Sequence, residues 1–324
     1  MRAAGSPSQH LELLSSKMAG YVLSSKADNT VSKYYGGFRR WSQFITREGG
    51  CALPGQPIHV ALYLTHMLDT GCSHSVLTTA LYSIKWAHGI SGMSDPTENC
   101  FVKSLMESSK RQDRPPRVKK NCVSTSDIIE LCEKYKDETD LLVIRDLVMI
   151  VLAFAGFLRY DELRALRVRD ISFQDTYLKL IIRKSKTDQY RLGDELVIVR
   201  GETVACPYRI MQKYMSLLGS TDPDYFLFMP LVRGRASCKL IHKNKALSYT
   251  RARECIVRRL REVAVNQNLG LHSLRAGGAT EAANNDVNER CWKRHGRWRG
   301  DISKDGYISD SLSHRLQVTK RLGL

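Results

Sequence analysis

The segment SSKRQDRPPRVKKN, at positions 108–121, limits the folds open to this chain more than any other stretch. A helix does not pass easily through two consecutive prolines, because proline lacks the amide hydrogen and restricts the residue before it. Six residues of the segment are basic and one is acidic, so burying it would be costly. We therefore expect a basic linker at 111–121 between a domain at 10–110 and a domain at 122–324. Its charge suits a row of phosphates, although a merely solvated linker would have the same composition.

The size and charge of the chain indicate a folded protein with a polyanionic partner. Its 324 residues suffice for two domains, and 50 basic against 33 acidic residues give a formal charge of +17. Nucleic acid is the expected partner, and an anionic membrane is the weaker alternative. The longest apolar stretch, at 147–158, has twelve residues, whereas a membrane-spanning helix needs roughly 20.

The N-terminus and the cysteines bear on the location of the protein. MRAAGSPSQHLELL lacks the apolar core of a signal peptide. The nine cysteines are scattered without a CxxC pair, which suits a reducing compartment and argues against a disulfide scaffold or a zinc site. We expect a soluble, intracellular protein that spans no membrane.

Hydrophobic periodicity predicts a mainly α-helical chain with a small antiparallel β-sheet. Before the linker, apolar residues recur at helical spacing from Val31 to Ile45, and further helices are predicted over 59–68 and 73–90. After it, an apolar run within 139–166 predicts a buried helix or helix pair. TYLKLIIR alternates, with Leu178, Leu180 and Ile182 on one side, and ELVIVR would be its antiparallel return. Helices are predicted again beyond position 248.

Two places after the linker carry charged groups near predicted buried elements. In GFLRYDEL, Arg159 and Glu162 lie one helical turn apart, and a structural ion pair explains them readily. Lys184 and Lys186 fall in KSKTDQYRLGD, the predicted hairpin turn, where exposed lysines are common. Neither pattern alone indicates a function.

Two further places combine basic and aromatic groups. LHSLRAGGAT puts His272 and Arg275 at a helix start beside small residues, which let a backbone or a ligand come close. A core histidine beside a surface arginine is the alternative. RHGRWRGDISKDGYISD puts Trp298 nine residues before Tyr307, and a solvated basic face with buried rings is the alternative there. Just before it, Cys291 and Trp292 are predicted to be core residues.

Together these residue types form a set suited to phosphodiester chemistry without a metal ion. Two guanidinium groups can hold the non-bridging oxygens of one phosphate. A phenol attacks only when its proton is removed and its target is polarised. A lysine can protonate a leaving 5′ oxygen, a histidine can transfer a proton near neutrality, and an indole N–H can donate to a phosphate oxygen.

The order of these residues resembles the tyrosine recombinase (phage integrase) family. RYDEL, with Arg159 and Glu162, is similar to the family's R-x-x-E-L box, and HSLR at 272–275 is similar to its H-x-x-R box. HGRWRGDISKDGYI looks most like the Crypton or DIRS-type recombinases of eukaryotic mobile elements. The stretch departs from the usual LGH, which leaves His295 as an extra residue for which phosphate contact or helix capping is expected rather than catalysis.

The resemblance implies a role for each matching residue. Arg159 and Arg275 would hold the scissile phosphate, and Tyr307 would attack it to give a 3′-phosphotyrosyl bond. Lys186, with Lys184 as the alternative, would protonate the leaving 5′ hydroxyl. The remaining matches are His272 for proton transfer, Trp298 for packing and hydrogen bonding to the phosphate, and Glu162 for orienting the first arginine.

The resemblance also implies an architecture and partners. A helical core-binding domain and a catalytic domain would clamp double-stranded DNA, as a tetramer on paired sites, in the nucleus, without metal, ATP or another cofactor. Expected DNA contacts are Arg114, Arg117, Lys119, Lys120, Lys184, Arg294, Arg297 and Arg299. Two other functions remain open at this point: a domesticated DNA-binding protein without activity, and a type IB topoisomerase that rejoins the same strands.

Overall fold

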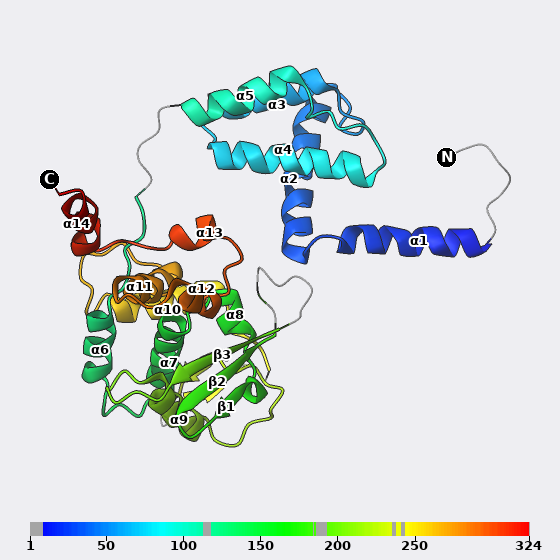
Figure 1. The fold of residues 1–324 in the computed structure, drawn as a ribbon. Coiled ribbons are helices and arrows are strands. Elements are labelled where there is room, and N and C mark those ends of the chain that lie inside the picture. The colour runs from blue at the N-terminus through cyan, green and yellow to red at the C-terminus, as the bar shows by residue number, and fades with distance from the viewer. Residues whose placement is uncertain are drawn as a thin grey trace. The chain divides into compact units, whose positions relative to one another are not determined.

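A computed structural model describes residues 9–112, 118–183, 185, 193–234, 238–240 and 244–323 (Figure 1). The chain divides into two compact units, Met1–Pro116 and Arg117–Leu324. Lys184 and Lys186, the predicted hairpin lysines, lie outside the described residues, as do Arg114 and Arg117 of the predicted linker.

The first unit is made of helices in its described part. They are α1 (Gln9–Ser24), α2 (Asp28–Arg47), α3 (Pro57–Asp69), α4 (His74–Ile90) and α5 (Cys100–Arg111). α2 packs on α4 and α3 packs on α5, so that the apolar face predicted around Val31 to Ile45 supplies Trp41 and Ile45 to the core. α1 buries none of its residues.

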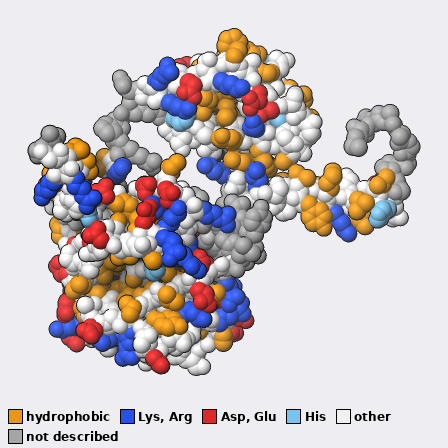
Figure 2. Space-filling view, in the orientation of Figure 1, with side chains coloured by type: hydrophobic (Ala, Val, Ile, Leu, Met, Phe, Trp, Pro, Cys, Tyr) orange, Lys and Arg blue, Asp and Glu red, His pale blue; other side chains and the backbone are white. Residues whose placement is uncertain are grey.

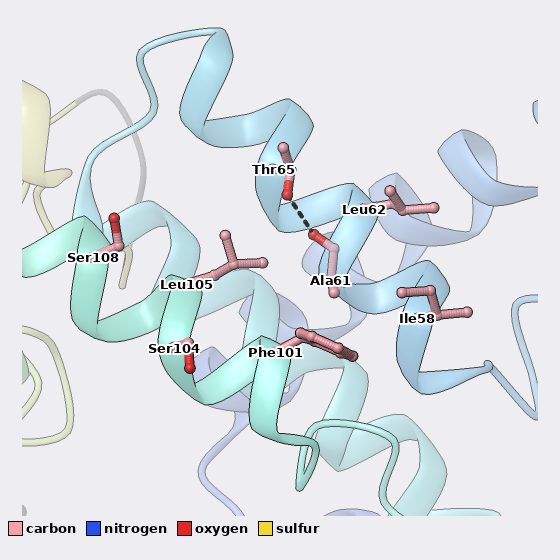
Figure 3. A pocket seen from close by; sticks show the side chains of 8 residues that line it. All are labelled: Ile58, Ala61, Leu62, Thr65, Phe101, Ser104, Leu105 and Ser108. Atoms are coloured by element: carbon pink, nitrogen blue, oxygen red, sulfur yellow. Dashed lines mark hydrogen bonds between the residues drawn. The ribbon is translucent and has the colours of Figure 1, made fainter.

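A shallow groove of about 420 Å³ lies between α3 and α5 (Figure 3). Its lining is mainly apolar, and the hydroxyl of Thr65 donates to the carbonyl of Ala61 within α3 at 3.0 Å. The groove therefore offers few polar groups for chemistry, and the predicted catalytic residues all belong to the second unit.

The second unit is built around α7 (Leu141–Ala155), whose side chains are buried along most of its length, as the apolar run predicted. α6 (Thr125–Lys134), α8 (Tyr160–Ala165), α9 (Pro207–Leu218), α10 (Tyr249–Leu260) and α11 (Leu271–Asn284) pack against it. Figure 1 shows α10 and α11 above α7 and the sheet to its side. The chain ends with α12 (Glu289–His295), α13 (Asp301–Asp305) and α14 (Leu312–Arg321).

The sheet is antiparallel and small. β1 (Ile171–Phe173), β2 (Tyr177–Ile182) and β3 (Asp194–Val199) lie in that order, and β2 pairs with β3 from Tyr177–Val199 to Ile182–Asp194. β4 (Leu231–Arg233) pairs with β5 (Cys238–Leu240) separately. Alternate residues of β2 are buried because successive side chains point to opposite faces of a strand, which confirms the predicted face. The predicted fold class is thus confirmed. Within the described residues, no helix has the length and apolar character needed to cross a membrane.

Candidate active site

Arg159 and Glu162 form the start of α8. The backbone N–H of Arg159 donates to Oε2 of Glu162 at 3.0 Å, and its guanidinium Nη1 donates to Oε1 at 2.7 Å. This is the capping arrangement in which the third helical residue reaches back to the residue before the helix. The i,i+3 ion pair that the sequence suggested is therefore present. The side chain of Arg159 remains 13% exposed, whereas that of Glu162 is 1% exposed.

A second arginine, Arg297, binds the other side of the same carboxylate. Its Nη2 donates to Oε2 of Glu162 at 2.9 Å, and its Nη1 donates to the carbonyl of His295 at 2.7 Å. The residue is buried, and its backbone is in the left-handed region with φ of 56°, which is uncommon for a residue with a side chain. The guanidinium of Arg297 is thus bound by a carboxylate and backbone carbonyls, which gives it a structural role, and its contact with DNA stays a prediction.

The charge of Glu162 is held by these two arginines. Burial alone would raise the pKa of its carboxyl group. The positive charges of Arg297 and Arg159, together with the backbone N–H of Arg159, outweigh burial and lower that pKa below its ordinary value. Glu162 therefore stays ionised and orients both guanidinium groups.

Arg275 lies on α11 at the centre of the site and is fully buried. Its guanidinium donates to the carbonyls of Phe157 and Gly296, while its Nε has no hydrogen-bond partner among the described residues. The same guanidinium lies 4.2 Å from the ring centroid of Trp298 and 5.2 Å from that of Tyr307. Burial, and then the charges of Arg159 and Arg297, lower its pKa to about 9, which still leaves it charged at neutral pH.

Two glycines bring α11 close to its neighbours. A Cβ on Gly277 would lie 2.0 Å from the carbonyl oxygen of Val123, and one on Gly278 would lie 2.2 Å from that of Phe154. No side chain fits at such distances, so the small residues noted in the sequence admit a backbone here. The close approach holds α11, the helix that carries Arg275, against the end of α7 and the segment before α6.

The predicted aromatic residues meet at this arginine. The ring centroids of Trp298 and Tyr307 are 5.6 Å apart, and those of His272 and Tyr307 are 6.4 Å apart. Trp298 is buried, and its Nε1–H has no hydrogen-bond partner among the described residues. Tyr307 is half-buried and His272 is exposed. A buried donor without an acceptor carries an energetic penalty unless a ligand supplies one, and a phosphate oxygen would do so.

The side chain of His295 makes a structural contact with the backbone of α7. Its Nε2 lies 2.8 Å from the carbonyl of Ala155, the last residue of α7, and therefore carries the ring proton, because a carbonyl only accepts. Burial lowers the pKa of the imidazole, and the nearby charges of Arg297 and Arg275 lower it further. This contact satisfies a carbonyl at the end of α7, in line with the predicted helix capping.

The other residues predicted near this site differ in how far they are exposed to solvent. Trp292 is buried as expected, but Cys291 is exposed, so its predicted place in the core is wrong. Consecutive residues of a helix point about 100° apart, so α12 directs Cys291 away from the side that buries Trp292. The remaining described basic residues predicted to contact DNA are exposed: Lys119, Lys120, Arg294 and Arg299. Figure 2 shows basic and acidic side chains intermixed on the visible face of this unit.

Two residues of the site were not found from the sequence. Phe157 has a left-handed backbone with φ of 46°, and its carbonyl accepts from both Arg275 and Arg297. Nothing in its residue type signals this role. Lys304 is buried three residues before Tyr307. The available signal was that DISKD has one apolar residue, Ile302, which is too few to form an apolar stripe.

Comparison with known proteins gives sequence relatives of one kind. No protein-family model matches the chain. An integrase/recombinase xerD homolog of Selenomonas ruminantium is 27% identical over 302 residues, which cover 92% of this chain and 86% of that protein. The recombinase Cre of Escherichia phage P1 is 24% identical over 195 residues, which cover 59% of this chain and 55% of Cre.

Solved structures share the fold at low identity. The XerH site-specific recombinase in a post-cleavage complex with a palindromic difH substrate gives a TM-score of 0.58 at 12% identity, covering 91% of this chain and 78% of that one. A lambda integrase dimer bound to a COC′ core site gives 0.52 at 13% identity, covering 91% of this chain and 76% of that one. At these identities the likeness concerns the fold.

Proposed function

We propose that the chain is a tyrosine recombinase (integrase), similar to the relatives above, which cleaves and rejoins DNA at specific sites through a 3′-phosphotyrosyl intermediate. One observation carries the proposal. The guanidinium of Arg275 lies against both the Tyr307 ring and the Trp298 ring, whose Nε1–H has no partner in the described structure. A nucleophile, a buried cation and an unused donor thus lie together, and attack on a phosphodiester requires these three kinds of group.

Each residue has a defined part in the step. Arg159 and Arg275 hold the non-bridging oxygens, and Glu162 orients Arg159 through the bonds at 2.7 and 3.0 Å. Trp298 donates from Nε1 to a phosphate oxygen. His272, whose ring adjoins that of Tyr307, takes part in proton transfer.

The bonds and protons of the step balance without another reactant. The Oη of Tyr307 forms a bond to phosphorus as the bond from phosphorus to the 5′ oxygen breaks. The phenolic proton leaves toward His272, and Lys186 or Lys184 protonates the departing 5′ hydroxyl. The phosphotyrosyl ester keeps the energy of the original ester, so attack by a second 5′ hydroxyl rejoins the strands without ATP.

The proposal extends to the rest of the chain. The helical unit before the linker would be the core-binding domain, and the basic linker would follow the DNA backbone between the two units. Lys119, Lys120, Arg294 and Arg299 support phosphate contact, because all four are exposed. A tetramer on paired DNA sites, a Crypton or DIRS-type mobile-element origin and a nuclear location belong to the same proposal, supported by the HGRWRGDISKDGYI stretch.

Covalent trapping on nicked DNA tests the proposal. The protein is incubated with a library of randomised duplexes that carry a nick. After cleavage near the nick, the short fragment that bears the free 5′ hydroxyl diffuses away and leaves the adduct. We expect a denaturation-resistant protein–DNA adduct with the natural chain and none with Tyr307→Phe. An adduct with Tyr307→Phe would refute the assignment of the nucleophile, and none with either chain would leave the inactive DNA-binding protein as the better account.

Trapping also yields the DNA sequence for a second measurement. Two copies of the trapped site are placed on one plasmid with distinguishable flanks. A recombinase exchanges the flanks, whereas a type IB topoisomerase only relaxes the supercoils. Relaxation without exchange would therefore favour the topoisomerase.

A further inference from the structure

α13, the short helix that precedes Tyr307, has one buried side chain, that of Lys304. Lys304 is the only buried residue of the helix, and its apolar neighbour Ile302 is 93% exposed. A helix normally packs through an apolar stripe. Here the buried residue is a lysine whose side chain is only 4% exposed.

The buried ammonium group is fully provided with partners. It donates to Glu289 of α12 and lies 3.3 Å from Asp305 and 3.5 Å from Asp301. It also lies 5.0 Å from the ring centroid of Trp292. The three carboxylates are more than half exposed, so they need no partner to remain charged, whereas an ammonium at this depth without carboxylates would be very unfavourable.

These contacts reach the nucleophile by two routes. Through the backbone, the N–H of Tyr307 donates to the carbonyl of Lys304 at 3.0 Å. Through the rings, Trp292 packs on Trp298 at 5.9 Å between centroids, and Trp298 packs on Tyr307 at 5.6 Å. Lys304 and Arg275 thus lie against the two ends of the same tryptophan pair.

We infer that Lys304 is a positioning residue, which holds α13 on α12 and so fixes Tyr307 for attack. The inference rests on the proposed function for the reaction that it serves. Misplacing a reacting group by about 1 Å can slow a reaction roughly 100-fold without changing how the substrate binds. Loss of Lys304 should therefore lower the rate of adduct formation and leave DNA affinity unchanged.

Charge-neutral and charge-keeping variants test this in the full chain. With saturating protein on the trapped nicked duplex, Lys304→Met should form adduct roughly 10- to 100-fold more slowly, and Lys304→Arg should recover most of the rate. Lys293→Met is the matched control, because Lys293 binds the same Asp301 at 2.6 Å from the surface of α12 and should leave the rate within twofold. Glu289→Gln removes the charge of an exposed partner of Lys304 and should slow adduct formation at least threefold. This variant tests the inference even if Lys304→Met does not fold.

Hydrogen exchange gives a readout that needs no catalysis. Backbone amides of 304–308 should exchange at least tenfold faster in Lys304→Met than in the natural chain, and Lys293→Met should leave them unchanged. A Lys304→Met protein with natural exchange and adduct formation would overturn the inference, as would a rate loss that Lys304→Arg does not recover. If the natural chain forms no adduct, the proposed function fails, and exchange alone then decides whether Lys304 holds α13.

Discussion

Replacing Arg297 by alanine distinguishes the buried structural role that this residue has in the structure from the DNA contact that the sequence suggests. The change removes the 2.9 Å bond to Glu162 and leaves that buried carboxylate with Arg159 as its remaining cation. Removing one member of a buried ion pair costs about 3–5 kcal/mol, and Arg159 keeps the value near the lower end. For a domain of 150–250 residues, about 3 kcal/mol corresponds to a fall in melting temperature of roughly 6–12 °C.

Calorimetry and DNA titration together measure this effect. Arg299→Ala is the control, because Arg299 is exposed and should change stability by at most about 0.5 kcal/mol. If Arg299 binds a phosphate, its loss should also reduce the salt dependence of DNA binding by about one ion, whereas Arg297→Ala should not. An unchanged melting temperature for Arg297→Ala, with a reduced salt dependence, would refute the buried role of this residue.

Three further outcomes follow from the same site. Burial lowers the pKa of His295, so the unfolded chain takes up a proton first as the pH falls below about 6.5. The unfolding free energy should therefore fall from pH 7 to pH 5. In urea titrations, His295→Gln should reduce this dependence of the unfolding free energy on pH. A Cβ on Gly296 would lie 1.7 Å from the Trp298 ring, so Gly296→Ala should shift tryptophan fluorescence and lower the melting temperature, whereas Gly300→Ala, with open space around it, should do neither. Trp298→Phe should slow adduct formation roughly tenfold or more with DNA affinity unchanged, and Trp298→His, which restores an N–H donor, should recover part of the rate.

The elements that the sequence predicted well are those whose signal is local. The alternation of Leu178, Leu180 and Ile182 reflects the two-residue period of a strand, so the buried face of β2 could be read without knowing its partners. The buried helix α7 was likewise visible as a continuous apolar run. Cys291 shows the limit: adjacent to buried Trp292, it projects from another side of a helix too short to show a period.

The roles of the arginines could not be assigned from the sequence. Arg294, Arg297 and Arg299 look alike in a basic stretch, yet only Arg297 is buried. What distinguishes it is Glu162, which lies 135 positions earlier in the chain, and a left-handed backbone that residue type does not predict. Identity at a motif position can be read locally, but burial depends on contacts between distant segments.

The charge balance of the assembled site explains why so many cations share one acid. Arg159, Arg275 and Arg297 bring three positive charges around Glu162, and the mutual repulsion of the arginines contributes to the lowered pKa of Arg275. The site without DNA thus carries a net charge of +2 in a buried setting, where such repulsion is poorly screened. In the proposed reaction a phosphodiester would bring one negative charge, and the pentavalent transition state formed by an ionised Tyr307 would bring two. In the proposed reaction the transition state would therefore neutralise the cluster and the substrate would neutralise only half of its charge, and such a difference in binding accelerates a reaction.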